Sequence, residues 1–264
     1  MSLRRIEALS KSFDGVKAVD GVSFELEAGR LLALIGPNGA GKSTCFNMIN
    51  GQLKPSSGSI RFDGREIAGK WPGEVGRLGV GRTFQIAATF NSMTVLENVQ
   101  MALFSHERRV FDLFDRVTSW RERDALALLD LVGMASHAKR SCAVLAYGDV
   151  KRVELAIALA NAPKLLLMDE PTAGMAPQER NELMALTARL AKERNIRCAG
   201  VLFTEHSMDV VFEYAGSLIV LARGHLIAQG DVHTTRNDAR VREVYLGTGA
   251  SFAPRAVSSE GDAR

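Results

Sequence analysis

The stretch Gly36-Pro37-Asn38-Gly39-Ala40-Gly41-Lys42-Ser43 matches the pattern G-x-x-x-x-G-K-[ST], and the rest of the sequence can be interpreted outward from it. Glycines let successive backbone N–H groups curl around phosphate oxygens, and a helix that begins near Gly41 would point its positive end at them. Lys42 would reach the outer phosphates of a nucleotide, and the Ser43 hydroxyl would ligate Mg²⁺. The stretch therefore predicts a phosphate-binding loop, and we include the following Thr44 among its nucleotide contacts.

The residues on both sides of this loop have the pattern that such a loop requires. Before it, the continuous apolar run Leu31-Leu32-Ala33-Leu34-Ile35 is typical of a strand covered on both faces. After it, residues 42 to 50 can form a helix that ends before Gly51. A flexible loop that matches the pattern by chance is the alternative, and it would need neither the strand nor the helix.

A second apolar run, Leu165-Leu166-Leu167-Met168, leads directly into Asp169 and Glu170. Two acids at the end of a buried strand are costly unless they bind something, and ligands of such sheets bind at the carboxyl ends of the strands. We expect Asp169 to hold Mg²⁺ through its water shell and Glu170 to polarise the attacking water as a general base. The simpler alternative is that Asp169 caps a following helix. Together, the two motifs predict a P-loop NTPase that uses ATP and Mg²⁺.

The remaining chain alternates between strand and helix patterns, which predicts an α/β fold with a mainly parallel sheet. The Asp-Gly pairs at 14–15 and 63–64 predict tight turns between short strands, and therefore an antiparallel β subdomain near the N-terminus. A capping-box spacing at 94–97 opens a helical stretch, so we expect an inserted helical subdomain at about 91–150. Further helices are expected at 123–132, 150–161 and 177–194, and further strands at 164–168, 199–203 and 217–221.

Composition excludes several classes of protein. The 33 basic and 30 acidic residues leave a net charge of only +3, which gives no argument for binding nucleic acid. Cys45, Cys142 and Cys198 are widely spaced, so neither a disulfide framework nor a zinc site is predicted, and a reducing compartment fits. There is no signal-peptide pattern and no apolar run of about 18 residues, so we expect any membrane role to come through a partner.

Further motifs resemble those of the ATP-binding cassette (ABC) ATPases, in the same order along the chain. They are Arg82-Thr83-Phe84-Gln85 (Q-loop), Leu145-Ala146-Tyr147-Gly148-Asp149 (the LSGGQ-type signature), Ala173-Gly174-Met175-Ala176 (D-loop) and Thr204-Glu205-His206 (switch histidine), with Phe13 at the adenine-stacking position. The resemblance covers residues 3–247 as one ABC ATPase domain, while the Ala-, Ser- and Gly-rich residues 250–264 are expected to be a disordered tail.

The resemblance implies a mechanism. In this family two subunits pack head to tail and sandwich two ATP molecules, each lying between one subunit's P-loop and the other's signature. Gln85 would contact Mg²⁺ and the attacking water and would sense the membrane partner, and His206 would contact the γ-phosphate. The implied protein is a peripheral ATPase at the cytoplasmic face of the inner membrane, bound to transmembrane permease subunits.

Within the family, the chain resembles the ATPases of branched-chain amino acid importers, which work with a substrate-binding protein. The resembling stretches are 81–85, 93–99, 170–175 and 241–247, together with Tyr147 in the signature. Importers for urea, amides or aromatic acids share these stretches, and an ATPase of lipid or lipopolysaccharide export is an alternative. A soluble ABC protein of DNA repair or translation would usually need two cassettes or a long coiled-coil insertion. The retained Glu170 and His206 argue against a pure regulator.

Three positions depart from the family pattern, and the polar groups lost at two of them, Ala146 and Ala176, affect what this chain offers its partner. Ala146 stands where the signature normally has Ser, whose hydroxyl donates to the γ-phosphate on the partner, and losing such a bond costs roughly 1.5–3 kcal/mol. Ala176 stands where the D-loop commonly has Asp or Asn, and Val150 where Gln is often present. We therefore expect a heterodimer with a related ATPase. The alternative is that the helix dipole and the Gly148 backbone suffice.

In this family the segment 86–98 would face the permease. Its apolar residues Ile86, Phe90 and Met93 are candidate docking contacts, and they could equally be part of the core of the helical subdomain.

Overall fold

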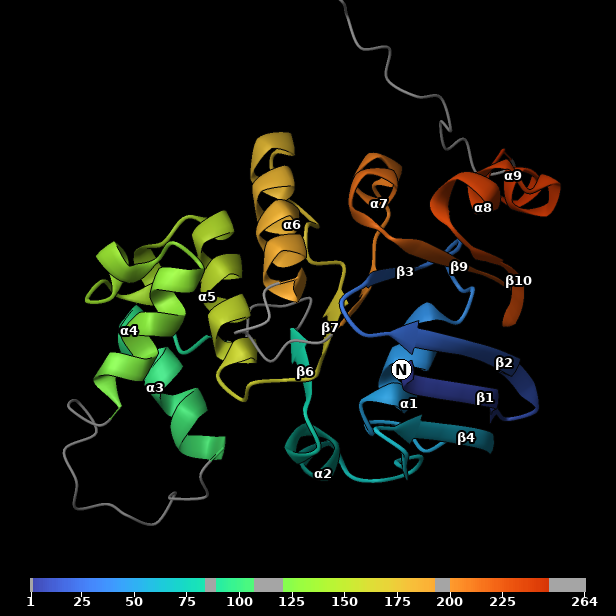
Figure 1. The fold of residues 1–264 in the computed structure, drawn as a ribbon, viewed down its shortest axis with the longest axis horizontal. Helices are drawn as coiled ribbons and strands as arrows, with labels where there is room; N and C mark the ends of the chain where they lie inside the picture. Colours follow the sequence, from blue (N-terminus) through green and yellow to red (C-terminus); the bar gives the residue numbers. More distant parts are fainter. Residues whose placement is uncertain (1, 84–88, 107–120, 193–199, 247–264) are drawn as a thin grey trace, which may run out of the picture.

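The computed structural model describes residues 2–83, 89–106, 121–192 and 200–246. The predictions for Gln85, for Ile86 and for a tail at 250–264 fall outside these ranges. Figure 1 shows the central strands with helices on both sides, the antiparallel strands at one end, and helices α3, α4 and α5 grouped at the other end.

The central sheet has six strands in the order β10-β9-β3-β8-β7-β6. Five of them are parallel, and only the edge strand β10 pairs antiparallel, with β9, so the predicted mainly parallel sheet is confirmed. Both β3 and β7 are buried at every residue, as their continuous apolar runs predict. The strands are β3 (Leu31–Ile35), β6 (Val80–Thr83), β7 (Leu165–Asp169), β8 (Val201–Thr204), β9 (Ser217–Ala222) and β10 (His225–Gly230).

A second, antiparallel sheet of order β2-β1-β4-β5 confirms the predicted β subdomain. Its first turn has positive φ at both Asp14 (46°) and Gly15 (88°), the conformation that a two-residue hairpin turn requires. The strands that flank this turn each have 12 residues, so the expectation of short strands was wrong. The four strands are β1 (Ser2–Phe13), β2 (Val16–Glu27), β4 (Ser57–Phe62) and β5 (Arg65–Glu66).

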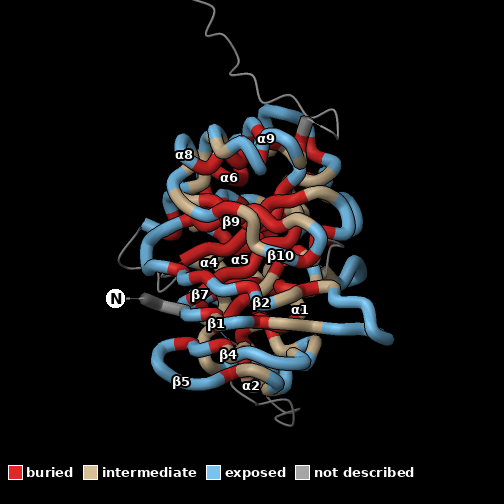
Figure 2. Tube along the Cα trace, turned by 90° about the vertical axis from the view of Figure 1, so that its right-hand side faces the viewer, coloured by how far each residue is buried: buried red, intermediate tan, exposed pale blue. Residues whose placement is uncertain are grey.

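The hydrophobic core has two parts, one on each face of the central sheet. Alternate residues of β3 point to opposite parts: Leu32 and Leu34 pack with helix α1 (Lys42–Ile49) and the antiparallel sheet. Leu31, Ala33 and Ile35 pack on the side that holds α5. Figure 2 shows the result as a band of buried chain through the middle of the molecule, with β5, α8 and α9 more exposed at its margins. Helices α1 and α5 are thus on opposite faces of one sheet.

The helical part contains α3 (Val95–His106), α4 (Glu122–Leu131) and α5 (Tyr147–Leu159). The capping box at its start is confirmed: the Glu97 N–H donates to Thr94 Oγ1 at 3.2 Å, and the Thr94 N–H donates to Glu97 Oε2 at 2.7 Å. Helix α5 begins at Tyr147, three residues before the predicted start, because Ala146 is still extended and serves as its N-cap. Residue 150 therefore lies inside α5. The bounds of the helical subdomain, about 91–150, stay a prediction.

The remaining helices are α2 (Pro72–Arg77), α6 (Pro177–Lys192), α7 (Met208–Tyr214), α8 (Val232–Asn237) and α9 (Ala239–Leu246). Of these, the sequence patterns predicted only α6, and the edge strands β6 and β10 were also missed. Among the described residues, no helix is both long and apolar enough to cross a membrane.

Candidate functional site

The predicted phosphate loop connects β3 to α1, and two of its glycines are required by their surroundings. A Cβ atom on Gly36 (φ +155°) would lie 2.3 Å from the carbonyl oxygen of Leu221, and one on Gly41 (φ +99°) would lie 2.5 Å from that of Ala18. Gly39 has a positive φ of +76° but nothing within 4 Å of its Cβ position. Of the other predicted loop residues, Asn38 is exposed, Pro37 is partly buried and Ala40 is buried.

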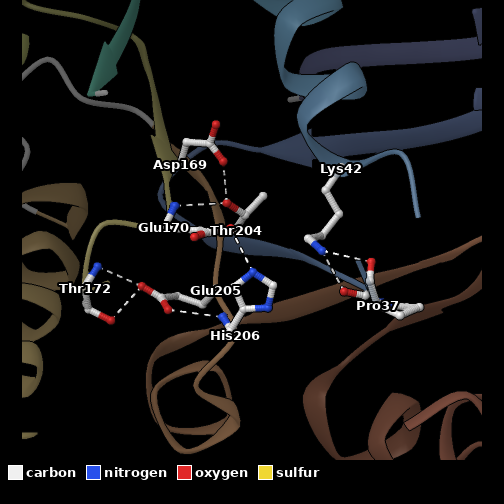
Figure 3. Close-up of polar contacts among 9 residues, drawn as sticks. Pro37, Lys42, Asp169, Glu170, Thr172, Thr204, Glu205 and His206 are labelled. Carbon is white, nitrogen blue, oxygen red and sulfur yellow. Dashed lines mark hydrogen bonds and ion pairs between the residues drawn. The ribbon is translucent and has the colours of Figure 1, made fainter. Parts of the chain in front are cut away.

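Lys42 begins α1 and is largely buried, with 7% of its surface exposed. Its Nζ donates to the carbonyl oxygens of Gly36 at 2.7 Å and Pro37 at 3.1 Å, so the side chain lies back along the loop (Figure 3). Burial lowers the pKa of Lys42, while the charges of Glu170 and Asp169 act in the opposite direction. A positive charge, the loop and both predicted acids are therefore close neighbours. Ser43 and Thr44 follow in the first turn of α1, exposed and partly exposed.

Asp169 ends β7 and is held from the two neighbouring strands. Its Oδ1 accepts from Thr204 Oγ1 at 2.8 Å, and its Oδ2 accepts from Arg82 Nη2 at 3.1 Å. Arg82 also donates to Asn47 Oδ1 and Gln52 Oε1, both at 2.8 Å. The next helix, α6, begins eight residues later, so the helix-cap alternative for Asp169 is wrong. In the sequence Arg82 stands out only as part of a motif, and its bond to the carboxylate was not predicted.

Glu170 and His206 come from the ends of β7 and β8 and meet at the same edge of the sheet. Glu170 Oε1 and His206 Nε2 are 2.8 Å apart. The Glu170 backbone has a φ of +49°, and its N–H donates to the carbonyl oxygen and to the Oγ1 of Thr204. The glutamate side chain is 20% exposed and the imidazole 50% exposed, so both can be reached by a ligand.

The signature-like residues, 145–149, lie at the start of helix α5. Ala146 is exposed and, as N-cap of α5, makes no side-chain capping bond, while Tyr147 is 45% exposed with the Lys151 ammonium 5.4 Å from its ring centroid. Gly148 is buried against α6, where a Cβ atom would lie 3.1 Å from the Glu179 carboxylate. Leu145 and Asp149 are partly buried. Because α5 and α1 pack on opposite faces of the sheet, one chain does not bring its signature to its own phosphate loop.

The segment Ala173-Gly174-Met175-Ala176 lies beside the signature-like residues. A Cβ atom on Gly174 would be 3.7 Å from Cε1 of Tyr147, and Ala176 is exposed. The exposed residues of the two segments, Ala146, Tyr147, Gly174 and Ala176, therefore lie close together on the surface of the chain.

Phe13 lies at the end of the β1–β2 hairpin, with 45% of its surface exposed and the Lys11 ammonium 5.2 Å from its ring centroid. The same hairpin contacts the phosphate loop, because Ala18 on β2 is the residue that Gly41 approaches. An aromatic face on that hairpin is thus available on the loop's side of the molecule.

Tyr245, on the C-terminal helix α9, is a further neighbour of the loop that the sequence analysis missed. Burial raises the pKa of its phenol, and the nearby backbone of Gly36 acts against this rise. Its stretch, 241–247, resembles a subfamily, which is one signal of a role, but a pattern alone does not say what the tyrosine contacts.

A phosphate loop between a buried strand and a helix, faced by Asp169 and Glu170 at the end of another parallel strand of the same sheet, defines a P-loop nucleoside triphosphatase. The family model described as "ABC transporter" matches residues 19–173. The chain belongs to this family, and it is an ABC ATPase, a transporter subunit that binds and hydrolyses ATP.

Curated relatives align over nearly the whole chain. The high-affinity branched-chain amino acid transport ATP-binding protein BraF of Pseudomonas aeruginosa is 37% identical over 249 residues, 92% of this chain and 96% of that protein. The corresponding protein LivG of Escherichia coli K12 is 36% identical over 254 residues, 93% of this chain and 98% of that protein. A probable LivG of Archaeoglobus fulgidus is 34% identical over 251 residues, 94% of this chain and 96% of that protein.

The chain also resembles solved structures of ATP-binding cassettes from ABC transporters. A nucleotide-free ATP-binding cassette from an ABC transporter matches with a TM-score of 0.82 at 32% identity, covering 93% of this chain and 99% of that one. An ATP-binding cassette in its ADP conformation matches with a TM-score of 0.82 at 31% identity, covering 94% and 99%. The fold predicted from the motifs is therefore confirmed.

Proposed function

We propose that this chain is the ATPase motor of a bacterial importer for branched-chain amino acids or related small polar compounds. The observation that carries the proposal is the convergence of Lys42, Asp169, Glu170 and His206 at one edge of the sheet, with Glu170 and His206 in direct contact at 2.8 Å. The transported class follows from the names of the relatives, which are branched-chain amino acid transport ATP-binding proteins. The chain would bind permease subunits at the cytoplasmic face of the inner membrane, and a substrate-binding protein would act with it indirectly.

The donor set of the site suits Mg²⁺ that arrives with ATP. Magnesium in such sites usually takes one or two protein ligands, several waters and phosphate oxygens, not a cage of side chains. Consistent with this, the described residues contain no group of three or more His, Cys, Asp or Glu that could hold a metal. We assign Ser43 and Asp169 to the ion, with Gln85 outside the described ranges, and the ion would neutralise charge on the β- and γ-phosphates.

The side chains around that site then have separate roles in converting ATP and water to ADP and phosphate. The ammonium of Lys42 would exchange its bonds to the Gly36 and Pro37 carbonyl oxygens for bonds to phosphate oxygens. The Glu170 carboxylate would accept the proton of the attacking water, and His206 would orient Glu170 and contact the γ-phosphate. Backbone N–H groups of the loop 36–44, where only Pro37 has none, would bind the phosphates, and Phe13 would stack on adenine.

A second subunit would complete the site, because the signature-like residues lie away from the phosphate loop of their own chain. Ala146 presents no hydroxyl at the N-terminus of α5, and Ala176 presents no polar side chain beside it. We therefore favour a heterodimer with a related ATPase, in which the ATP bound by the partner meets the weaker half-site. Ala146→Ser should raise the turnover or ATP affinity of the assembled transporter. An unchanged rate and affinity would argue for the alternative, in which the helix N-terminus suffices.

The surface that would meet the permease includes Phe90. Its side chain is 56% exposed, which a docking contact requires, whereas Met93 is partly buried and Ile86 lies outside the described residues. Phe90 is the docking candidate we retain.

The decisive experiment is ATP hydrolysis by the transporter assembled with its permease. Glu170→Gln should keep ATP binding and reduce the rate by about 10²–10⁴-fold, because the amide cannot accept the proton. Uptake of labelled leucine into vesicles should fall in parallel. Wild-type chain without any ATPase activity in the assembly, or Glu170→Gln with full activity, would overturn the proposal. Rapid ATP hydrolysis without leucine uptake would exclude branched-chain amino acids as the transported substrate, while the proposed role as an ATPase motor would stand.

A further inference from the structure

A buried carboxylate with no role in the resemblance lies between the two loops that carry Glu170 and His206. Glu205 has only 4% of its surface exposed, although it directly precedes a half-exposed histidine. Burying a carboxylate costs free energy unless its oxygens are hydrogen-bonded, so its bonds indicate what it is for.

Both carboxylate oxygens of Glu205 accept hydrogen bonds, and they do so from different loops. Oε1 accepts from the N–H of Thr172 at 2.9 Å and from its hydroxyl at 2.7 Å. Oε2 accepts from the N–H of His206 at 3.2 Å. Figure 3 shows the side chain lying between Thr172 and His206, with a bond to each. An ionised carboxylate accepts only, so three donors suit it. In the described part of the chain, no Lys or Arg forms an ion pair with Glu205.

These bonds belong to a longer series in which the last residue of β8 and the two residues after it contact the end of β7 and the turn that follows it. Thr204 contacts Asp169 and the backbone of Glu170, Glu205 contacts Thr172, and His206 contacts the side chain of Glu170. Of the three, Glu205 is the residue whose side chain joins the backbone N–H of Thr172, in the loop after Glu170, to the backbone N–H of His206.

Glu205 holds Thr172, which lies in the turn directly after the strained backbone of Glu170. Glu170 has a φ of +49°, a conformation that costs a non-glycine residue about 1–2 kcal/mol and persists only where the surroundings fix it. The following turn is closed by weak contacts, with Ala173 N–H to Glu170 O and Met175 N–H to Thr172 O both at 3.2 Å. Thr172, between them, is fixed at two atoms by Glu205, so this carboxylate stabilises the turn that aims Glu170.

We propose that Glu205 is a positioning residue, which sets the geometry of the Glu170–His206 pair and fixes the first residues of the adjoining 173–176 segment. The proposal rests on the catalytic site proposed above. Loosening the Glu205 bonds lets Glu170 and His206 separate while the phosphate loop, on another segment, keeps its shape. The affected quantity is thus the rate of hydrolysis and not the affinity for ATP, since small misplacements of reacting groups cost about 10²-fold per ångström.

The chain offers a matched pair of variants to test this. Thr172→Val removes a hydroxyl that donates to Glu205, and Thr187→Val removes one that donates to the Leu183 carbonyl oxygen within helix α6. Both threonines are 1% exposed, and the substitution is nearly isosteric in both. Glu205→Gln is the second probe, because its amide can still accept from Thr172 but would present an N–H group toward the N–H of His206.

In the assembled transporter we expect Thr172→Val and Glu205→Gln to reduce kcat by about 10–100-fold. The Kd of the full-length chain for a fluorescent ATP analogue should change less than about threefold. Thr187→Val should lower the melting temperature about as much as Thr172→Val and leave kcat unchanged. Equal kcat for Thr172→Val and Thr187→Val, or a loss of ATP affinity in proportion to kcat, would overturn the inference. Wild type and Glu170→Gln are measured in the same assay. If wild type hydrolyses ATP and Glu170→Gln does not, the proposed function stands, and the outcomes above then overturn only the role of Glu205.

Discussion

Replacing Gly41 by alanine is expected to damage the phosphate loop far more than replacing Gly39, although both glycines have a positive φ. A Cβ atom at position 41 would lie 2.5 Å from the Ala18 carbonyl oxygen, and Cβ atoms essentially never come closer than 3.0 Å to another heavy atom, so something must move by at least 0.5 Å. The obstacle is backbone on β2, within a ladder of paired strands, and it cannot rotate away as a side chain would. At position 39 nothing lies within 4 Å of the added atom.

The expected magnitudes follow from these two environments. A left-handed conformation costs an alanine about 1–2 kcal/mol, and this applies to both variants. Forcing an atom into occupied space adds about 1–3 kcal/mol for Gly41→Ala alone. In a domain of this size each kcal/mol lowers the melting temperature by about 2–4 °C, so Gly41→Ala should melt about 2–12 °C below Gly39→Ala.

The assay is thermal unfolding of the two full-length variants followed by circular dichroism, with ATP titrations on each. Gly41 is the N-cap of α1, so its displacement moves the N–H groups that would bind phosphate, and we expect a Kd for ATP weakened by about tenfold or more. Melting temperatures that coincide for the two variants would mean that backbone strain, and not the contact with Ala18, determines the need for glycine at position 41.

Other variants test contacts away from the glycines. Arg82→Lys keeps the charge beside Asp169 but loses the planar fork, so urea unfolding should show a loss of about 1–3 kcal/mol, and an unchanged midpoint would contradict it. Thr94→Ala removes the N-cap of α3 and should cost about 1 kcal/mol near neutral pH. The Thr94 N–H and hydroxyl hold the pKa of Glu97 below its usual 4.5. The stability that Glu97 contributes is therefore present above pH 4.5 and is lost as the pH falls through its lowered pKa. The difference in melting temperature between wild type and Thr94→Ala should narrow in acid, and a difference that stays constant with pH would be inconsistent with this. Burial raises the pKa of Cys45 to about 12, so mass spectrometry should find it alkylated by iodoacetamide only after unfolding, and rapid alkylation of the native chain would show that it is accessible.

Much of the fold could be predicted because its signals are local. The capping box of Thr94 and Glu97, the tight turn at Asp14 and the buried strand before Gly36 each depend on residues within a few positions of one another. Edge strands and short helices were missed because they lack a strong hydrophobic period: β6 has four residues and α2 has six.

The identity of the reacting groups could be predicted from the sequence alone. The spacing of the glycines with Lys42, and of the apolar run with Asp169 and Glu170, already requires a nucleotide phosphate and an acidic pair at the end of a strand. How those groups are held in place depends on contacts between residues far apart in the sequence. Glu205 contacts Thr172 across 33 positions and Arg82 contacts Asp169 across 87, and the pairing of parallel strands brings these residues together at one edge of the sheet. Patterns along the chain report which face of a strand is buried, whereas partners on different strands are fixed by how the strands are ordered in the sheet.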